Sequence, residues 1–402
     1  MSGVVIVGGG QAGASMSAKL RALDAEVEIT LIAAENDPPY QRPPLSKAYL
    51  LGEMARERLY LRPEEFYADK NILLRLSAPV TAIEPEAGTI EVDGETLPFD
   101  RLALTTGSIP NRLPAAIGGD LEGIFTVRSL ADVDRMSPHF QKDARVLVVG
   151  GGYIGLEAAA VTAKLGLRVT LVEMGDRIFG RVASSETAEV IRAAHQRHGV
   201  DIREGIGLDR LVGELGRVSG AALTDGSEVS VDFVIVGTGV RPDTRLAEAA
   251  GIACYNGISV DEMGETSAPG IWAAGDCACF PYRGGRLRLE SVQNAIDQAE
   301  AVAANILGAN TPYDPKPWFW SDQYDLKLQI AGLNSGYDRV VTRRTEGKES
   351  FWYYAGERLL AVDAISSPRD YMVGKRLIEM GKSPAPQVIA DPATDLKALL
   401  KL

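Results

Sequence analysis

The sequence is short of cysteine, of histidine and of long apolar runs, and each shortage excludes a class of protein. It holds three cysteines and three histidines in 402 residues. Three cysteines are too few for a disulfide framework and suit a reducing compartment. No apolar run reaches the length of a membrane span, and the N-terminus lacks a basic segment followed by an apolar one. We therefore expect a cytoplasmic protein with no membrane partner.

Positive charge is also scarce. The 42 Lys and Arg residues are outnumbered by 54 Asp and Glu residues, which gives a net charge of −12. This balance argues against a general nucleic-acid binder or a protein that binds membrane surfaces. The apolar share of 46% is ordinary for a globular protein, and 402 residues predict two or three domains.

Glycine is plentiful, and one glycine-rich stretch occurs twice. Residues 4–13 read VVIVGGGQAG and residues 146–155 read VLVVGGGYIG. Each stretch predicts a strand, a tight turn and the start of a helix, and a second strand follows. The G-x-G-x-x-G spacing is met by Gly8, Gly10 and Gly13, and again by Gly150, Gly152 and Gly155. Such glycines let the backbone turn, approach a pyrophosphate and pack the helix against the strand.

An acidic residue follows each glycine motif after about twenty residues, at the end of the next strand. These acids are Glu35 and Glu173, whose carboxylates suit ribose hydroxyls. A carboxylate at position 173 would repel a 2′-phosphate, and the nearest base is Arg177, so we expect NADH to be preferred to NADPH. Glycines that serve packing alone would leave both acids unexplained. Two dinucleotides in one chain indicate electron transfer from a nicotinamide to a flavin.

The rest of the chain divides by texture. Further buried strands are predicted in residues 232–239 and 269–278. From Pro312 onward aromatic residues cluster, and alternating segments such as residues 350–365 precede a final helix, which predicts a small α+β domain. The expected domains are residues 1–110 with 245–320, residues 111–244, and residues 321–402.

Five segments together resemble the FAD-dependent, NADH-using ferredoxin reductases of bacterial cytochrome P450 and aromatic-ring oxygenase systems. They are PPYQRPPLSKAYL, GGGYIGLE, AAGDCA, ESVQNAIDQA and PWFWSDQYD, in the family's order along essentially the whole chain. The resemblance implies a glutathione-reductase-like α/β fold with two Rossmann-like, three-layer ββα dinucleotide-binding domains and a C-terminal α+β domain. It also implies an enzyme that passes hydride from NADH to FAD and then single electrons to a [2Fe–2S] ferredoxin. We expect a monomer or a weak dimer.

The same resemblance implies the residues that hold each cofactor. For FAD they are Gly8, Gly10, Gly13, Glu35, Arg42, Pro44, Lys47, Thr106, Gly107, Asp276, Val292 and Trp320. For NADH they are Gly150, Gly152, Ile154, Gly155, Glu157, Glu173 and Gly239. Lys47, Glu157 and Trp320 are the implied catalytic residues, and no metal site is implied.

Several of these roles have a plainer alternative. Lys47 would steady charge on the reduced flavin and pair with Glu157, which could instead be a solvated acid on its helix. Trp320 would flank the flavin, or it is an ordinary core aromatic. Asp276 would bind ligand hydroxyls, or it caps a helix. Two departures from the family stand out: its ATG turn is TTG at residues 105–107, and Ala34 stands where many relatives carry an acid, one step before Glu35.

The family's ferredoxins are typically acidic, so an acidic reductase needs a local basic docking face. We expect it near Arg288, Lys316 and Trp320, with further basic residues at Arg283, Arg286 and Lys327. The alternative is a solvated hairpin with scattered arginines.

Three other classes share this architecture. Disulfide reductases and NADH oxidases or peroxidases need a redox cysteine in the comparable loop, but residues 36–60 contain none. Flavoproteins similar to apoptosis-inducing factor act partly through partner binding, and this chain lacks their insertions and basic surface. Cys277 and Cys279 are expected to pack as small apolar groups. His195 and His198 share a helix, where we expect a solvated face rather than a metal site.

Overall fold

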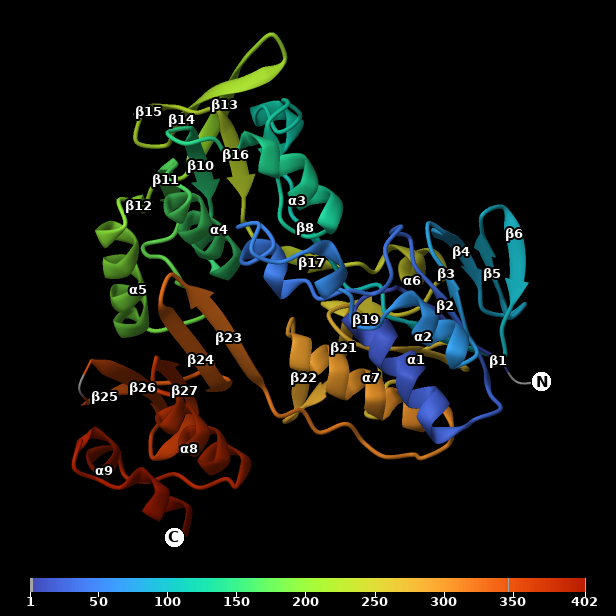
Figure 1. The fold of residues 1–402 in the computed structure, drawn as a ribbon. Helices are drawn as coiled ribbons and strands as arrows, with labels where there is room; N and C mark the ends of the chain where they lie inside the picture. The colour runs from blue at the N-terminus through green and yellow to red at the C-terminus, as the bar shows by residue number, and fades with distance from the viewer. Residues whose placement is uncertain (1–2, 346, 402) are drawn as a thin grey trace. The chain divides into compact units, whose positions relative to one another are not determined.

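The contacts within the chain separate two units, each built on a parallel sheet. The computed structural model describes residues 3–345 and 347–401. Unit 1 comprises residues 1–41, 55–109 and 240–317, and unit 2 comprises residues 42–54, 110–239 and 318–402. Figure 1 labels most of the helices and strands along the chain. The division into three domains predicted above stays a prediction.

The central sheet of unit 1 has five parallel strands in the order β20-β7-β1-β2-β3. Their bounds are β1 Gly3–Val7, β2 Glu28–Ile32, β3 Ile72–Arg75, β7 Arg101–Leu104 and β20 Ile271–Ala273. In register, Val4 lies beside both Ile29 and Arg101. The carboxyl ends of these strands therefore meet at one edge, where open α/β sheets bind their ligands.

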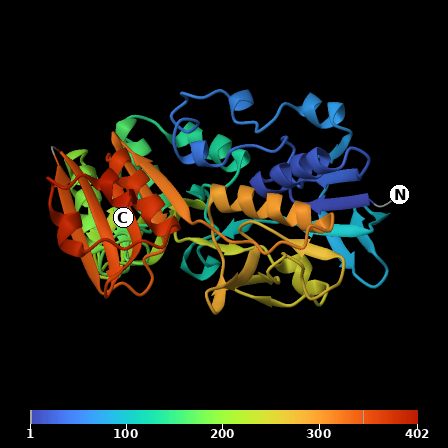
Figure 2. The same cartoon turned by 90° about the horizontal axis from the view of Figure 1, so that it is seen from below.

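Alternation along β1 sends its side chains into two different cores. Val4 and Ile6 pack with helices α1 (Gln11–Leu23) and α7 (Val292–Ile306), which lie side by side (Figure 2). Val5 and Val7 pack instead with the antiparallel strands β4 (Val80–Glu84), β5 (Thr89–Val92) and β6 (Glu95–Pro98) or the residues beside them. Helices, parallel sheet and antiparallel strands form the three layers that the resemblance implies.

Unit 2 repeats this plan around the sheet β12-β11-β10-β16-β9. The bounds are β9 Ile124–Phe125, β10 Arg145–Val149, β11 Arg168–Glu173, β12 Asp201–Glu204, β16 Phe233–Val236, α3 Leu130–Met136, α4 Tyr153–Lys164 and α5 Ser185–Arg197. Leu147 and Val149 alternate onto a core shared with the antiparallel strands β13 (Leu208–Glu214) and β14 (Arg217–Leu223), beside β15 (Glu228–Ser230).

Unit 2 also contains an antiparallel sheet in the order β23-β24-β27-β26-β25, with helix α8 (Pro368–Glu379) packed on it. The strands are β23 Trp318–Gln323, β24 Leu326–Gly332, β25 Arg339–Thr345, β26 Lys348–Ala355 and β27 Arg358–Ile365. The alternating segment at residues 350–365 is therefore a hairpin of two strands, with Gly356 in the turn at φ +56°. A Cβ on Gly374 of α8 would lie 2.9 Å from Val362 Cγ1, so this helix approaches the sheet closely.

The remaining elements are short. They are α2 Glu64–Asp69, α6 Arg245–Ala249, α9 Pro386–Ala390, β8 Ser108–Pro110, β17 Val240–Pro242, β18 Cys254–Tyr255, β19 Gly257–Ser259, β21 Ala278–Tyr282 and β22 Gly285–Leu287, with 3₁₀ turns at residues 43–46, 56–58, 115–117, 137–139 and 396–401. The predicted fold class is confirmed. Within the described part of the chain, no helix combines the length and apolarity that crossing a bilayer requires.

Candidate functional site

The first glycine turn, between β1 and α1, leaves space at only one of its three key glycines. Gly8 has φ +122°, and a Cβ there would lie 2.2 Å from the Thr105 carbonyl oxygen. A Cβ on Gly13 would lie 2.0 Å from the Gly8 oxygen. Around a Cβ on Gly10, by contrast, no described atom outside the adjoining backbone lies within 4 Å. Packing explains the outer glycines, and the middle one is open to a close-approaching ligand.

The second turn, between β10 and α4, repeats this pattern. A Cβ on Gly150 (φ +107°) would lie 2.5 Å from the Gly237 oxygen, and one on Gly155 would lie 2.0 Å from the Gly150 oxygen. A Cβ on Gly152 would have no described atom outside the adjoining backbone within 4 Å. Among the described residues, no side chain caps α1 or α4, so their first amides are left for an anion such as a pyrophosphate. The two turns thus fit the pyrophosphates of FAD and NADH.

The acid of the second motif is held in place by backbone amides. Glu173 is the last residue of β11 and accepts hydrogen bonds from Gly151 N and Gly175 N, both at 2.7 Å. Gly239, at φ +94°, follows β16 at the same edge of the sheet. Ile154, in the first turn of α4, is 41% exposed on that helix. The predicted NADH residues therefore gather at the carboxyl edge of one sheet.

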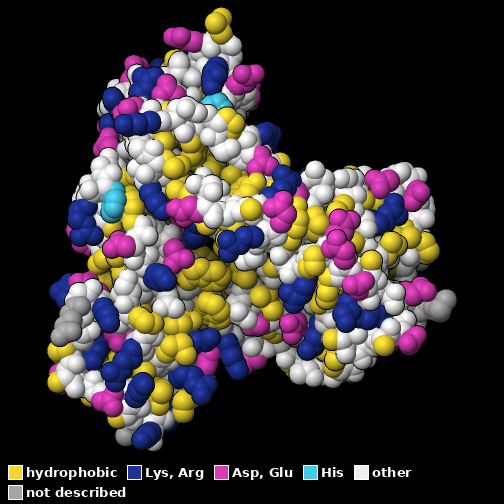
Figure 3. All heavy atoms as spheres, in the orientation of Figure 1, with side chains coloured by type: hydrophobic (Ala, Val, Ile, Leu, Met, Phe, Trp, Pro, Cys, Tyr) yellow, Lys and Arg dark blue, Asp and Glu magenta, His cyan; other side chains and the backbone are white. Residues whose placement is uncertain are grey.

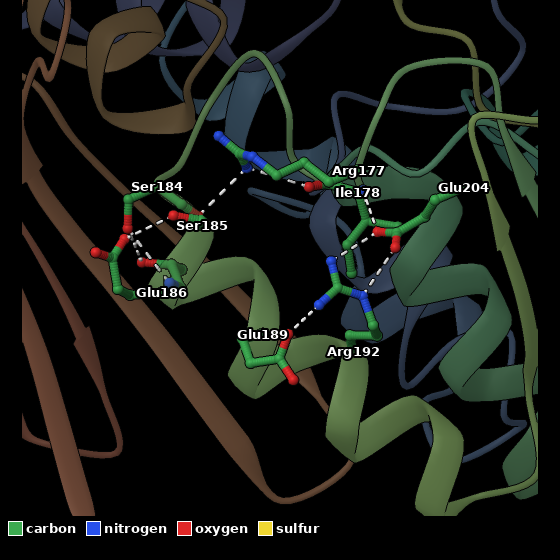
Figure 4. A network of polar contacts seen from close by, with 9 residues as sticks. Arg177, Ile178, Ser184, Ser185, Glu186, Glu189, Arg192 and Glu204 are labelled. Carbon is green, nitrogen blue, oxygen red and sulfur yellow. Dashed lines mark hydrogen bonds and ion pairs between the residues drawn. The ribbon is translucent and has the colours of Figure 1, made fainter.

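Arg177, the basic residue nearest to Glu173 in the sequence, is hydrogen-bonded to the backbone of the loop that follows Glu173, as Figure 4 shows. Arg177 donates to the carbonyl oxygens of Ala183 at 2.7 Å and of Ser184 at 3.3 Å. Glu204 accepts from Ile178 N at 2.7 Å and pairs with Arg192 at 2.9 Å. Since the Arg177 guanidinium is bonded to its own loop, it is poorly placed to receive a 2′-phosphate, which favours NADH.

The acid of the first motif is held differently. Glu35 stands three residues beyond the end of β2 and accepts a hydrogen bond from the Tyr40 hydroxyl at 2.5 Å. Ala34 is exposed. The carboxylate thus stands on a loop beyond the strand end, and the Tyr40 hydroxyl is one of its partners.

The other predicted FAD residues of unit 1 lie in loops at the same sheet edge. Thr106 and Gly107 follow β7, and Asp276 follows β20. Ser108 Oγ donates to Asp276 Oδ2 at 2.9 Å and ties these loops together. Val292 is the first residue of α7, whose cap is Ser291, so helix capping does not account for Asp276.

A buried ion pair lies in unit 2, where the resemblance expects it. Lys47 Nζ and Ser46 Oγ both donate to Glu157 Oε2 at 2.6 Å, and Ser321 Oγ donates to Glu157 Oε1 at 2.7 Å. Glu157 is only 3% exposed, so the alternative of a solvated helix-face acid is wrong. A carboxylate this deeply buried requires partners of this kind.

Three further predicted residues also lie in unit 2. Pro44 belongs to the 3₁₀ turn at residues 43–46, and Arg42 precedes it and donates to the Arg128 carbonyl oxygen at 2.6 Å. Trp320 is half-buried on β23, with its ring centroid 5.5 Å from that of Trp318.

Comparison with known proteins agrees with this arrangement. Residues 2–299 match the family described as pyridine nucleotide-disulphide oxidoreductase, and residues 318–400 match the family described as reductase C-terminal. The chain belongs to this oxidoreductase family. It is 42% identical over 402 residues to the 5,5′-dehydrodivanillate O-demethylase ferredoxin reductase subunit of a Sphingobium strain, covering 98% of this chain and 97% of that protein.

A second relative is also named a ferredoxin reductase. The chain is 38% identical over 407 residues to putidaredoxin reductase of Pseudomonas putida, covering 99% of this chain and 96% of the relative. Among solved structures, it matches the covalent putidaredoxin reductase–putidaredoxin complex with TM-score 0.96 and 38% identity, covering 100% of this chain and 98% of that chain. The resemblance stated from the sequence is confirmed.

The family name refers to a disulfide, but this member is built without one in its described residues. All three cysteines are free thiols there. Cys277 and Cys279 are fully buried, and Cys277 Sγ donates to the Leu104 oxygen at 3.4 Å. Burial raises the pKa of the Cys277 thiol, which makes it less reactive. A buried thiol of raised pKa is poorly suited to a dithiol step.

One sequence prediction for this oxidoreductase is wrong. His195 does not lie on a solvated face of α5: it has no exposed surface and contacts Gln323 and Tyr324. Strand β23 and the turn after it cover that part of the helix, which a helical pattern alone does not reveal. No cluster suited to a metal ion occurs among residues 3–345 and 347–401.

Sequence analysis also missed the partners that hold the charged residues. They are Ser46 and Ser321 on Glu157, Ser108 on Asp276, and Tyr40 on Glu35. Tyr40, Ser46 and Ser321 had a local signal, because they lie in the PPYQRPPLSKAYL and PWFWSDQYD segments of the family resemblance, whereas Ser108 lies in neither.

Proposed function

We propose that this protein is an NADH-dependent, FAD-containing ferredoxin reductase that serves a cytochrome P450 or a ring-hydroxylating oxygenase. The observation that carries the proposal is the pair of glycine turns whose middle glycines, Gly10 and Gly152, are open while their neighbours are closed by packing. One such turn alone would indicate a protein that binds one nucleotide. Two, in a relative of ferredoxin reductases, favour electron transfer between two dinucleotides.

The chain's own residues bind, orient and balance charge. When bound, FAD would take a hydride from NADH and release single electrons to a [2Fe–2S] ferredoxin. Gly8, Gly10, Gly13, Glu35 and Asp276 are the residues proposed to hold FAD in unit 1. Thr106, Gly107 and Val292 complete this set, and Arg42, Pro44, Lys47 and Trp320 are proposed to contact the flavin ring.

The Lys47–Glu157 pair is the proposed electrostatic centre. The Lys47 ammonium is bonded to Glu157 at 2.6 Å and its side chain is 20% exposed. A positioned cation of this kind stabilises negative charge that develops next to it. Glu157, with Gly150, Gly152, Ile154, Gly155, Glu173 and Gly239, is proposed to receive NADH. Trp320 is proposed to lie toward the electron exit.

The partner is proposed to be an acidic ferredoxin that meets a local basic surface. On the face drawn in Figure 3, basic and acidic side chains are interspersed, so docking would depend on a few placed charges. Arg288 is a poor docking residue because its side chain is 11% exposed and donates to the Asp276 oxygen at 3.2 Å. Arg283 and Lys316, both exposed, serve this role better. We extend the proposal to a cytoplasmic location.

An anaerobic NADH titration tests the proposed reaction. The purified protein should be yellow, bleach on addition of NADH, and recover its colour when mixed with one of a panel of [2Fe–2S] ferredoxins. Rapid oxygen consumption without ferredoxin would favour an NADH oxidase. A long-lived complex with NADH that reduces no ferredoxin would favour a protein similar to apoptosis-inducing factor.

The docking surface has its own test. Arg283→Glu with Lys316→Glu should raise the KM for ferredoxin about tenfold, as expected for loss of charge complementarity. Turnover of NADH with ferricyanide, which needs no docking, should stay unchanged. Equal loss of both activities would contradict the assignment.

A further inference from the structure

Helix α5 holds a buried histidine that the proposed function does not use. His195 Nε2 lies 2.8 Å from Gln323 Oε1, and its Nδ1 lies 2.9 Å from the Tyr324 hydroxyl. The residue has no exposed surface, whereas His198, one turn along, is exposed and stacks on the Tyr324 ring. Both ring nitrogens of His195 are therefore satisfied by the end of β23 and the turn that follows.

The hydrogen bonds continue from His195 to the buried ion pair. Gln323 Nε2 donates to Ser321 Oγ at 3.2 Å, and Ser321 Oγ donates to Glu157 Oε1 at 2.7 Å. His195, Gln323, Ser321 and Glu157 are each at most 3% exposed. This series of hydrogen bonds links α5 through β23 to α4, and all of its residues belong to unit 2.

The carboxylate end of this series of hydrogen bonds, where Glu157 pairs with Lys47, fixes the direction of every bond in it. An ionised Glu157 can only accept, so Ser321 must donate to it. The Ser321 oxygen then accepts from the Gln323 amide, which turns the Gln323 carbonyl oxygen toward His195. That oxygen requires a hydrogen on Nε2, and the bare Nδ1 accepts from the Tyr324 hydroxyl. One histidine tautomer satisfies all these bonds.

Burial supports a neutral imidazole at this position. Desolvation lowers the pKa of His195 to about 4, so at neutral pH one ring nitrogen carries a hydrogen and the other is bare. A charged ring would have hydrogens on both nitrogens. Nδ1 would then have to donate to the Tyr324 oxygen instead of accepting from its hydroxyl.

We propose that His195 is a positioning residue for Glu157: as the Nε2–H tautomer it orients Gln323 and Ser321, so that Ser321 holds the carboxylate against Lys47. This inference rests on the proposed function for its consequence, because Glu157 is there the acid at the NADH site. The tautomer itself does not depend on the proposed function, because it follows from the hydrogen bonds alone.

The tautomer is measured directly on the unmodified protein. With only three histidines in the chain, ¹⁵N-histidine labelling and long-range ¹H–¹⁵N correlation spectra can be assigned using His139→Gln and His198→Gln. The expected result at pH 7 is a neutral His195 with hydrogen on Nε2. Hydrogen on Nδ1, or a charged ring, would overturn the proposal whatever reaction the protein catalyses.

Substitutions measure the consequence for the reaction. His195→Leu and Ser321→Ala should each lower the rate of flavin reduction by NADH about tenfold. Ser321→Ala removes a hydrogen bond to the Glu157 carboxylate, and His195→Leu removes the bond that orients Gln323. His195→Gln, which can place an N–H near the Nε2 position, should restore most of the rate. His139→Gln, a substitution outside the chain of hydrogen bonds, is the matched control and should react like the wild type.

The outcomes are separable. Wild-type rates in both His195→Leu and Ser321→Ala would overturn the positioning role. So would a His195→Gln variant as slow as His195→Leu, because that pattern indicates a packing role. If His195→Leu does not fold, Ser321→Ala and the tautomer decide. A wild-type protein that NADH does not reduce refutes the proposed function, while the tautomer still tests the hydrogen-bond direction.

Discussion

The two glycine turns share one backbone plan but hold their acids in different ways. In both, the outer glycines are closed by carbonyl oxygens at 2.0–2.5 Å from a hypothetical Cβ, and the middle glycine is open. In unit 2, Glu173 ends its strand and is fixed by two amides at 2.7 Å. In unit 1, Glu35 lies beyond its strand, and the Tyr40 hydroxyl donates to it.

This difference shows what the motif encodes. The three glycines encode the path of the backbone. Gly8 and Gly13 leave no room for a side chain, and Gly10 leaves space for a ligand. The anchoring of the acid is set by neighbours outside the motif. A carboxylate held by rigid amides is ready to accept ribose hydroxyls from an exchanging coenzyme at little entropic cost.

The largest effect should come from closing an outer glycine. Gly13→Ala and Gly155→Ala each place a methyl group 2.0 Å from a carbonyl oxygen of the turn. We expect each to lower the free energy of unfolding by about 3 kcal/mol or more. Limited proteolysis with mass spectrometry should locate the first cuts of Gly13→Ala in unit 1 and those of Gly155→Ala in unit 2. Cuts in the same unit for both variants would contradict the parallel between the turns.

A second effect concerns unit 2 alone. Burial raises the pKa of Asp363 to about 6, against 3.8 for its ordinary value, although Tyr353 and Thr187 donate to it. The folded state then binds the proton more tightly than the unfolded state, so this group lowers stability as pH rises from about 4 to 6. Asp363→Asn should be more stable than the wild type by about 3 kcal/mol at pH 7 and equal to it near pH 4.

Denaturant unfolding at both pH values checks this prediction. His195 acts with the opposite sign: its pKa of about 4 lies below the ordinary 6.5, so its contribution to stability is present above 6.5 and is lost as pH falls to 4. In the wild type the two groups oppose each other between pH 4 and 6. Asp363→Asn should therefore show a steeper rise of stability with pH. An unchanged pH profile would contradict the burial of an ionisable Asp363.

Whether the sequence predicts a feature of the site depends on how far apart in the sequence the residues that form it lie. The glycine turns and Glu173 could be predicted because strand, turn, helix and acid follow one another within about thirty residues of one unit. The Lys47–Glu157 pair could be predicted only from the family resemblance. Ser321 and His195 could not be assigned their contacts, because β23 reaches α4 and α5 across more than a hundred residues, and no periodicity reports which face a strand covers.

Substitution of the middle glycines should distinguish the two turns by the ligand that is lost, with little effect on the fold. Gly10→Ala and Gly152→Ala add a methyl group where no described atom outside the adjoining backbone lies within 4 Å, at φ −88° and −85°, so stability should change by about 1 kcal/mol or less. Gly10→Ala should lose FAD on purification. Gly152→Ala should keep FAD and bind NADH at least about tenfold more weakly. Flavin absorbance and NADH titration distinguish the two, and FAD loss from Gly152→Ala would contradict the assignment of the turns.

The smallest effect should come from the acids, and it tests the comparison most sharply. Glu173→Ala removes both the ribose acceptor and the carboxylate that holds the Gly151 and Gly175 amides, so the KM for NADH should rise about tenfold. Glu35→Ala removes an acceptor carried by a loop, and FAD affinity should fall only about threefold. Glu189→Ala, which alters a side chain 69% exposed on α5, is the control and should change neither. If Glu35→Ala proves the more damaging, the loop-held acid is as preorganised as the strand-held one, and the two turns differ less than their hydrogen bonds indicate.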